Sequence, residues 1–187
     1  MRPGALLLFP GAGSDRDHSS LVAIEAALPK LPVERADFPY RIAGRKAPDR
    51  APVLLDAVRA EAAALVASAH IRANRLVLGG RSMGGRMCSM AVAAGLPAAG
   101  LVLISYPLHP PGKPDTLRTE HLPSLAVPCL FVQGTKDPFG TPDELTAATA
   151  MIPGPVTHGW IDNGRHDLAR ADDRIAAAVS EWLRSLR

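Results

Sequence analysis

A serine lies between two glycines in the segment Gly80-Arg81-Ser82-Met83-Gly84. The segment follows an apolar run typical of a buried strand and precedes a run compatible with a helix, the context in which the pattern G-x-S-x-G holds a nucleophile. The turn must hold the serine in a sparsely populated backbone conformation, and side chains two residues away would clash with the strand and the helix. We therefore predict that Ser82 is an exposed nucleophile; the alternative is a glycine-rich turn that happens to contain a serine.

A serine hydroxyl becomes a good nucleophile when a histidine accepts its proton and a carboxylate orients that histidine. His166 directly follows the last expected strand, and Asp137 directly follows the strand before it. The order Ser82, Asp137, His166 is the nucleophile–acid–base order of one class of hydrolases. We predict these roles, with a pair of ordinary loop residues as the alternative. Asp162 and Asp167 are too close to His166 in sequence to face its far nitrogen easily.

A tetrahedral intermediate needs two hydrogen-bond donors aimed at its oxyanion. The amide of Met83 follows the nucleophile at the expected start of a helix, where an N–H group is free to donate. The loop after the first expected strand should supply the second donor, most simply the amide of Ala12, with Gly11 as its neighbour in reserve. The alternative for this loop is a simple turn between a strand and a helix.

Four residues are weaker candidates for contact with a substrate: Gly11, His18, Arg81 and His109. His18 follows the first loop, and His109 lies in a proline-rich segment, where it contacts substrate or makes a structural hydrogen bond. Arg81 and Arg86 flank the serine turn. They either bind a substrate carboxylate or brace the turn through salt bridges, and we favour bracing.

Other chemistries find little support. The segment from Gly11 to Arg16 lacks the third glycine of a dinucleotide-binding G-x-G-x-x-G, and there is no phosphate-binding Walker motif. No pair of cysteines or histidines has zinc-type spacing. We therefore expect no cofactor and no metal. The net charge of +3 is mild, and the densest basic stretch, at residues 41–50, has no interleaved aromatics, so we expect no nucleic-acid partner.

The composition suits one domain over residues 1–187, because 47% of the chain is hydrophobic and only 21% is charged. No apolar run approaches the roughly 20 residues that span a bilayer, so no membrane association is expected. Residues 1–10 imitate a signal peptide, but their apolar part is too short and Pro10 interrupts it. Cys88 and Cys129 form no disulfide framework and look like core residues, which favours a cytoplasmic protein. The oligomeric state is not predictable.

Strands and helices alternate along the chain. Strands are expected at residues 5–9, 33–38, 75–79, 101–105, 129–132 and 156–161. Helices are expected at about residues 20–28, 51–70, 83–95, 141–151 and 171–186, with Ser19 or Ser20 capping the first and a capping box at residues 141–144. Residues 39–48 and 106–128 are expected to be loops. This order predicts an α/β fold with one mostly parallel sheet and helices on both faces, whose ligands bind beyond the carboxyl ends of the strands.

These features resemble the α/β-hydrolase superfamily, and within it the compact dienelactone-hydrolase-like branch and a small subgroup with the turn Gly-Gly-Arg-Ser-Met-Gly-Gly-Arg. The resemblance covers nearly the whole chain and implies nucleophile Ser82, acid Asp137, base His166 and oxyanion amides at Ala12 and Met83. The family's usual first two strands and its cap domain are absent, which leaves about six strands and an open pocket. Dienelactone hydrolases proper have cysteine where this chain has serine, so their substrate is not carried over.

The sequence thus predicts a serine hydrolase, carboxylesterase-like, that cleaves a small-molecule carboxylic ester or thioester through an acyl-enzyme. The missing cap suggests a short acyl chain. A peptidase or a cofactor-free perhydrolase would use the same residues, because the choice of leaving group depends on pocket shape. The alternative is a non-catalytic member of the fold that serves as a binding or assembly module.

Overall fold

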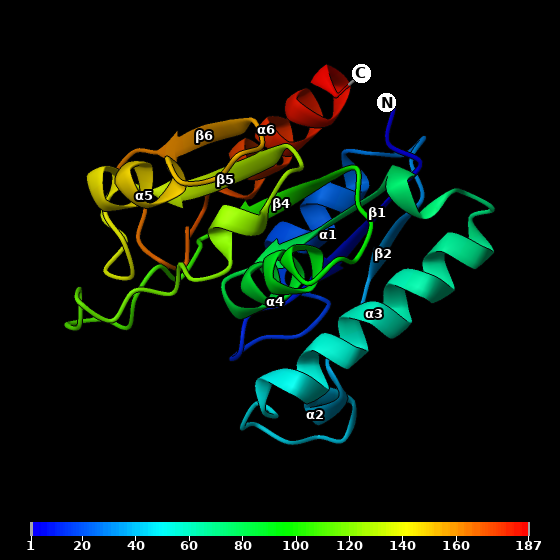
Figure 1. Ribbon diagram of the computed structural model, residues 1–187, viewed down its shortest axis with the longest axis horizontal. Coiled ribbons are helices and arrows are strands. Elements are labelled where there is room, and N and C mark those ends of the chain that lie inside the picture. Colours follow the sequence, from blue (N-terminus) through cyan, green and yellow to red (C-terminus); the bar gives the residue numbers. More distant parts are fainter. Residues whose placement is uncertain (1, 187) are drawn as a thin grey trace.

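The computed structural model describes residues 2–186, and its centre is a six-stranded parallel sheet (Figure 1). Along the sheet the strands lie in the order β2-β1-β3-β4-β5-β6. Their bounds are β1 Ala5–Phe9, β2 Val33–Arg35, β3 Leu76–Arg81, β4 Gly100–Ile104, β5 Cys129–Gly134 and β6 Val156–Ile161. Because all neighbours are parallel, the carboxyl ends of the strands lie along one edge of the sheet. The predicted α/β architecture is confirmed.

Helices cover both faces of the sheet. The α-helices are α1 Ser19–Ala26, α2 Pro39–Ile42, α3 Ala51–Ser68, α4 Met83–Ala93, α5 Pro142–Thr149 and α6 Asp172–Ser185. Two short 3-10 helices, η1 Ala73–Arg75 and η2 Leu122–Ser124, complete the described secondary structure. Helices α1 and α6 contact each other on one face, and α3 and α4 do so on the other (Figure 1).

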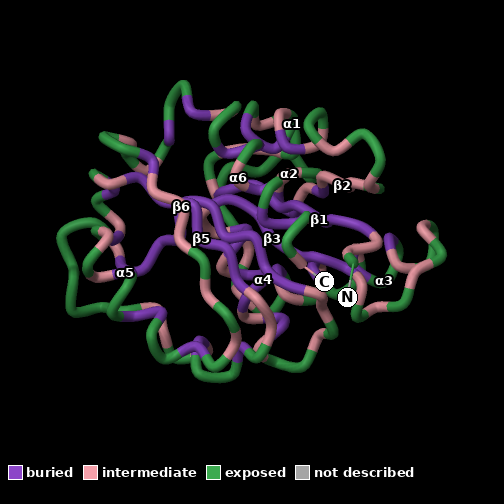
Figure 2. The backbone as a smooth tube through the Cα atoms, turned by 90° about the horizontal axis from the view of Figure 1, so that it is seen from above, coloured by how far each residue is buried: buried purple, intermediate pink, exposed green. Residues whose placement is uncertain are grey.

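The sheet separates two apolar clusters. Alternate residues of β1 point to opposite faces, so that Leu6 and Leu8 pack with α1 and α6, while Leu7 and Phe9 pack with α3 and α4. The four central strands form the buried centre of the molecule, and most exposed residues lie on helices and loops (Figure 2). Burial on both faces explains why the central strands read as continuous apolar runs.

Several element boundaries differ from the sequence-based expectation. The edge strand β2 ends at Arg35, and the chain then turns so that Phe38 stacks on Phe9 with ring centroids 4.7 Å apart. The expected loop at residues 39–48 contains the short helix α2, begun by Pro39, whose fixed φ suits a first helical position. Strands β3 and β5 continue two residues further than expected, because their neighbours extend the hydrogen-bond ladder.

The N-terminal caps of two helices show when local sequence patterns are enough to predict a cap. Thr141 and Glu144 form the predicted capping box at the start of α5. For α1 the expected serine cap is wrong: His18 occupies the cap position, and its Nδ1 accepts a hydrogen bond from the amide of Ser20. No helix within residues 2–186 has the length and apolar character needed to cross a bilayer.

Candidate active site

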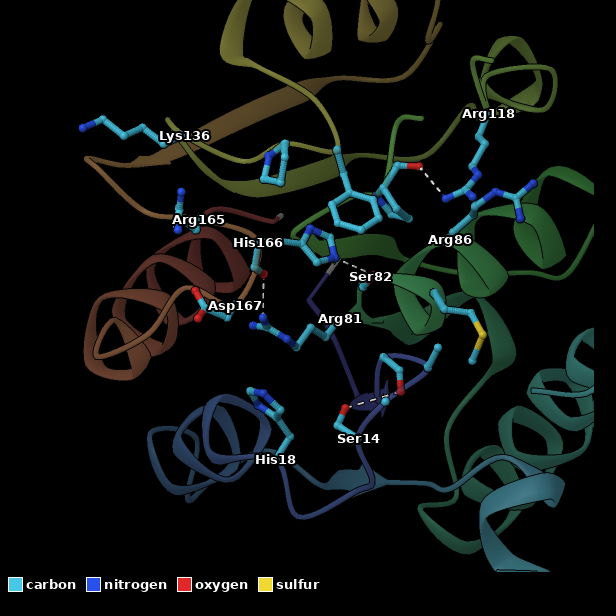
Figure 3. Close-up of a pocket in the computed structure, with 17 residues that line it drawn as sticks. Ser14, His18, Arg81, Ser82, Arg86, Arg118, Lys136, Arg165, His166 and Asp167 are labelled. Atoms are coloured by element: carbon cyan, nitrogen blue, oxygen red, sulfur yellow. Dashed lines mark hydrogen bonds between the residues drawn. The ribbon is translucent and has the colours of Figure 1, made fainter. Parts of the chain in front are cut away.

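A cleft of about 950 Å³ opens at the carboxyl edge of the sheet (Figure 3). It is formed by the loops that follow β1, β3, β4, β5 and β6. Its lining residues are Gly11, Ala12, Gly13, Ser14, His18, Arg81, Ser82, Met83, Arg86, Pro107, Arg118, Lys136, Pro138, Phe139, Arg165, His166 and Asp167. The cleft therefore lies at the edge of the sheet where the sequence predicts that ligands bind.

Ser82 sits between β3 and α4 in a left-handed conformation, with φ 49° and ψ −115°. Such a backbone is costly for a residue with a side chain, and it persists only where its surroundings enforce it. The glycines on either side remove the obstruction. A Cβ at Gly80 would lie 2.1 Å from the carbonyl oxygen of Phe9, and a Cβ at Gly84 would lie 2.4 Å from the same oxygen. The loop after β3 thus packs directly on β1, as the glycine pattern predicts.

The three residues predicted from sequence spacing lie in one hydrogen-bonded row. The Oγ of Ser82 is 2.9 Å from Nε2 of His166, and Nδ1 of His166 is 2.9 Å from Oδ2 of Asp137. A carboxylate only accepts, so Nδ1–H donates to Asp137 and leaves Nε2 free to accept the serine proton. The two carboxylates closer to His166 in sequence, Asp162 and Asp167, make no such contact with its ring.

Asp137 is held by groups that the sequence analysis did not single out. Its carboxylate is 1% exposed and accepts hydrogen bonds from the amide of Phe139 and from Nε2 of Gln133, each at 2.9 Å. The ring of Phe139 stacks on the imidazole of His166 with centroids 3.9 Å apart. The hydrogen bonds to Asp137 and the stacking of Phe139 on His166 arise because β5 and the turn after it lie close together in the fold. No local sequence pattern predicts them.

Arg81 braces the loop that carries His166. The side chain is 6% exposed, and its Nη2 donates to the carbonyl oxygen of His166 at 2.6 Å (Figure 3). Bracing was the favoured prediction, but the partner is a carbonyl group and, within residues 2–186, Arg81 takes part in no salt bridge. Burial lowers the pKa of this guanidinium from its ordinary value.

The two amides predicted for the oxyanion both belong to residues that line the cleft, Ala12 and Met83. Met83 is the first residue of α4, where an amide has no partner within the helix. The loop after β1 lies against the serine turn, since a Cβ on Gly11 would be 3.5 Å from the Cβ of Ser82. The hydroxyl of Tyr40 donates to the carbonyl oxygen of Ala12 at 2.9 Å and fixes that loop.

The three remaining candidates for substrate contact differ in where they lie. Gly11 and His18 line the cleft, and burial lowers the pKa of His18. His109 does not line the cleft, and of the two roles offered for it the structure shows the structural hydrogen bond. That ring is 5% exposed, its Nδ1–H donates to the carbonyl oxygen of Pro110 at 2.9 Å, and its Nε2 lies 3.5 Å from Glu144. The proline-rich segment folds back on α5 and takes the ring away from the cleft.

The cleft also contains residues without a predicted role. Arg118, Lys136 and Arg165 line it and contribute positive charge. They follow three different strands, so only the folded sheet brings them together. Within residues 2–186 no cluster of three or more His, Cys, Asp and Glu side chains is placed to hold a metal ion.

A family model described as "Alpha/beta hydrolase domain" matches residues 3–182, and the chain belongs to this family. The structure is similar to a dienelactone hydrolase from Anabaena variabilis, with a TM-score of 0.78 and 20% identity over 99% of this chain and 88% of that chain. It is also similar to the esterase domain of a Rhodothermus marinus protein, with a TM-score of 0.72 and 17% identity over 98% and 88% of the two chains.

A third similar structure is the type II thioesterase BorB from the borrelidin biosynthetic cluster, with a TM-score of 0.69 and 21% identity over 98% of this chain and 96% of that chain. At these identities the likeness is one of fold. Together with the family match, it confirms the prediction of an α/β-hydrolase with the compact architecture of dienelactone hydrolases.

Proposed function

We propose that the protein is a serine hydrolase that cleaves a carboxylic ester or thioester through an acyl-enzyme. The observation that carries the proposal is the hydrogen-bonded row from Ser82 through His166 to the buried Asp137, with both links at 2.9 Å. A carboxylate, an imidazole and a hydroxyl in this order are the parts that nucleophilic acyl transfer requires.

In the proposed reaction the Oγ of Ser82 attacks the acyl carbon while Nε2 of His166 accepts its proton. The imidazolium that forms is stabilised by Asp137, which stays ionised. His166 then gives the proton to the departing alcohol or thiol, and the acyl group remains on Ser82. A water molecule, deprotonated by the same imidazole, attacks the acyl carbon and releases the acid. Loss of the hydrogen bond to Asp137 would let the imidazole rotate or take the wrong tautomer.

We propose that the amides of Ala12 and Met83 stabilise the oxyanion. Both residues line the cleft beside Ser82, and among residues 2–186 neither amide donates to a backbone carbonyl of a turn or loop. The start of α4 adds the positive end of the helix dipole at the position of Met83. Donors that are already aligned need no reorganisation when charge develops, which is why such amides lower the barrier.

The substrate class rests on two supports. Solved structures with the same fold include an esterase domain and a thioesterase. Between β4 and β5 the described chain contains only loops and η2, so no separate cap covers the cleft. We propose a small-molecule substrate with a short acyl chain, because an uncapped cleft offers little apolar wall for a long one.

The test is labelling with a fluorophosphonate probe, read by intact mass. We expect one adduct on the wild-type protein, none on Ser82→Ala and slow labelling of His166→Ala. Ser14→Ala is the matched control, since Ser14 is another serine of the cleft but its hydroxyl donates to the carbonyl oxygen of Gly11 and not to a histidine. An unlabelled but folded wild-type protein would contradict the proposal and favour a non-catalytic binding module.

A further inference from the structure

The cleft is strongly cationic although the whole chain carries a net charge of only +3. Its lining includes one acid, Asp167, and five cationic side chains: Arg81, Arg86, Arg118, Lys136 and Arg165. Within residues 2–186 none of these five takes part in a salt bridge, whereas Arg16, Arg35 and Arg45 elsewhere pair with carboxylates. A concave surface lined by unpaired charge of one sign attracts ligands of the opposite sign.

Two of the five cations, Arg86 and Arg118, lie side by side at one side of the cleft that Ser82 also lines (Figure 3). The amide of Arg86 donates to the carbonyl oxygen of Ser82 at 3.0 Å, so Arg86 stands one helical turn, about 5.4 Å, beyond the nucleophile. Its Nε is buried without a partner. The only side-chain hydrogen bond of Arg118 within the described residues is a long one, at 3.4 Å, to the carbonyl of Pro107.

Their proximity is unfavourable as long as no anion is present. Burial lowers the pKa of Arg118, and the positive charge of Arg86 lowers it further. Glu120 lies near His121, and within residues 2–186 it forms no salt bridge with either arginine. Two guanidinium groups that repel each other and retain unused donors offer the geometry that binds a carboxylate or a phosphate.

A network of hydrogen bonds holds the backbone of both arginines. The hydroxyl of Ser89 donates to the carbonyl oxygen of Arg86 at 2.8 Å, and the hydroxyl of Tyr106 donates to the carbonyl oxygen of Arg118 at 2.8 Å. His121 joins the two hydroxyls, with its Nε2 at 2.8 Å from Ser89 and 3.5 Å from Tyr106. The backbones of the two arginines are therefore positioned before a ligand arrives, which reduces the entropy lost on binding.

We propose that Arg86 and Arg118 form a subsite for a second, anionic group of the substrate, a carboxylate or a phosphate separated from the scissile carbonyl by a few atoms. This proposal rests on the proposed function, since it uses Ser82 as the nucleophile. It narrows the substrate class from esters in general to anionic esters, for example the half-ester of a short dicarboxylic acid.

The test compares kcat/KM for 4-nitrophenyl hemiglutarate with kcat/KM for 4-nitrophenyl valerate, in which a methyl group replaces the carboxylate. We expect the wild-type protein to prefer the anionic ester. In Arg118→Gln the ratio of the two values should fall about tenfold, because a hydrogen bond to a charged group is lost. Arg118→Lys should recover part of the ratio. Since both esters are measured on the same variant, a general loss of activity cancels.

Arg72→Gln is the matched control, because it removes the same charge from an exposed residue that precedes β3, at the opposite edge of the sheet. Its ratio should equal that of the wild-type protein. Arg86→Gln, the second variant, should lower the ratio as Arg118→Gln does. The proposal is overturned if the wild-type protein hydrolyses the valerate ester through Ser82 but shows no preference for the anion, or if Arg118→Gln matches Arg72→Gln. The proposed function would then stand.

A binding measurement separates failure of the subsite from failure of catalysis. Glutarate and inorganic phosphate are added at constant ionic strength to Ser82→Ala and to the double variant Ser82→Ala/Arg118→Gln, and the melting temperature is recorded. Stabilisation that is lost in the double variant supports the subsite even if no ester is hydrolysed, and the more effective anion identifies the group. Equal melting temperatures of each variant with and without the anions would overturn it.

Discussion

Asp137→Asn is a sharp test of the proposed mechanism, because the groups around Asp137 favour one orientation of the side-chain amide of an asparagine at this position. One carboxylate oxygen, Oδ1, accepts from the amide of Phe139, which cannot turn round. The other oxygen, Oδ2, is 2.9 Å from both Nε2 of Gln133 and Nδ1 of His166. Nδ1 of His166 also lies 3.0 Å from Oδ1. We expect an asparagine to keep its oxygen at Phe139 and to place its NH₂ group at the Oδ2 position, closer to Nδ1, with the amide of Gln133 turned so that its unpartnered Oε1 accepts.

The consequence is a change of tautomer. Facing an N–H donor, Nδ1 of His166 must accept a hydrogen bond, which moves the imidazole proton to Nε2. Nε2 can then no longer accept the proton of Ser82. Loss of the correct tautomer in a Ser-His-Asp triad costs about 10⁴-fold in kcat, or roughly 5 kcal/mol at 1.36 kcal/mol per factor of ten. The fold should persist, because the substitution is isosteric.

The assay is the second-order rate of fluorophosphonate labelling, measured for the wild-type protein, Asp137→Asn and Asp167→Asn. Asp167 provides the matched change, since it is a carboxylate of the cleft next to His166 in sequence. A loss of less than tenfold in Asp137→Asn, or a larger loss in Asp167→Asn, would refute the assignment of Asp137. Circular dichroism of each variant establishes that the fold is retained.

Three further predictions concern the fold. Gly84→Ala should lower the free energy of unfolding by about 1–3 kcal/mol in urea titrations, because its Cβ would meet a backbone oxygen of β1 at 2.4 Å. Gly13→Ala should lower it less, because nothing lies within 4 Å of a Cβ at Gly13. Equal losses of stability in the two variants would contradict the packing of Gly84 on β1. Burial lowers the pKa of His121 from 6.5 to about 4, so the unfolded chain binds its proton first and stability falls as the pH drops from about 6.5 to 4. After allowance for solvent screening, the wild-type protein should lose roughly 2 kcal/mol more than His121→Gln between pH 7 and 4.5, and parallel losses would contradict this. Burial raises the pKa of Cys88 and that of Cys129, the latter to about 12, so neither thiol should react with Ellman's reagent until denaturant is added; reaction of the native protein would count against their burial.

Much of the fold could be predicted because its signals are local. The run at residues 5–9 is apolar and bounded by loop residues, and the structure has a strand there. The capping box at Thr141 and Glu144 depends on residues three positions apart and is present as predicted. The cap of α1 was mispredicted because His18 took the role usually filled by serine, which no spacing rule distinguishes.

The candidate site could be predicted only in part. Ser82, Asp137 and His166 each follow a strand, and parallel strands end at one edge, so the sequence predicted that the three residues lie at the same edge of the sheet. For His109, which also follows a strand, the sequence left a substrate contact and a structural hydrogen bond open, and the structure shows the latter because its segment turns away to pack near α5. Whether a loop residue faces a cleft depends on the whole path of the loop, and proline content does not reveal that path.

What the sequence by itself determined is the set of local structures: the strands, the strained serine turn and the order of the three reactive residues. These follow from hydrophobic periodicity and from the steric freedom of glycine. The tertiary structure decided the order of strands in the sheet, the donors that hold Asp137, and the meeting of Arg86 with Arg118 beside Ser82. Such contacts join residues far apart in the chain, and hydrophobic patterning specifies that a residue is buried but not which partner it meets.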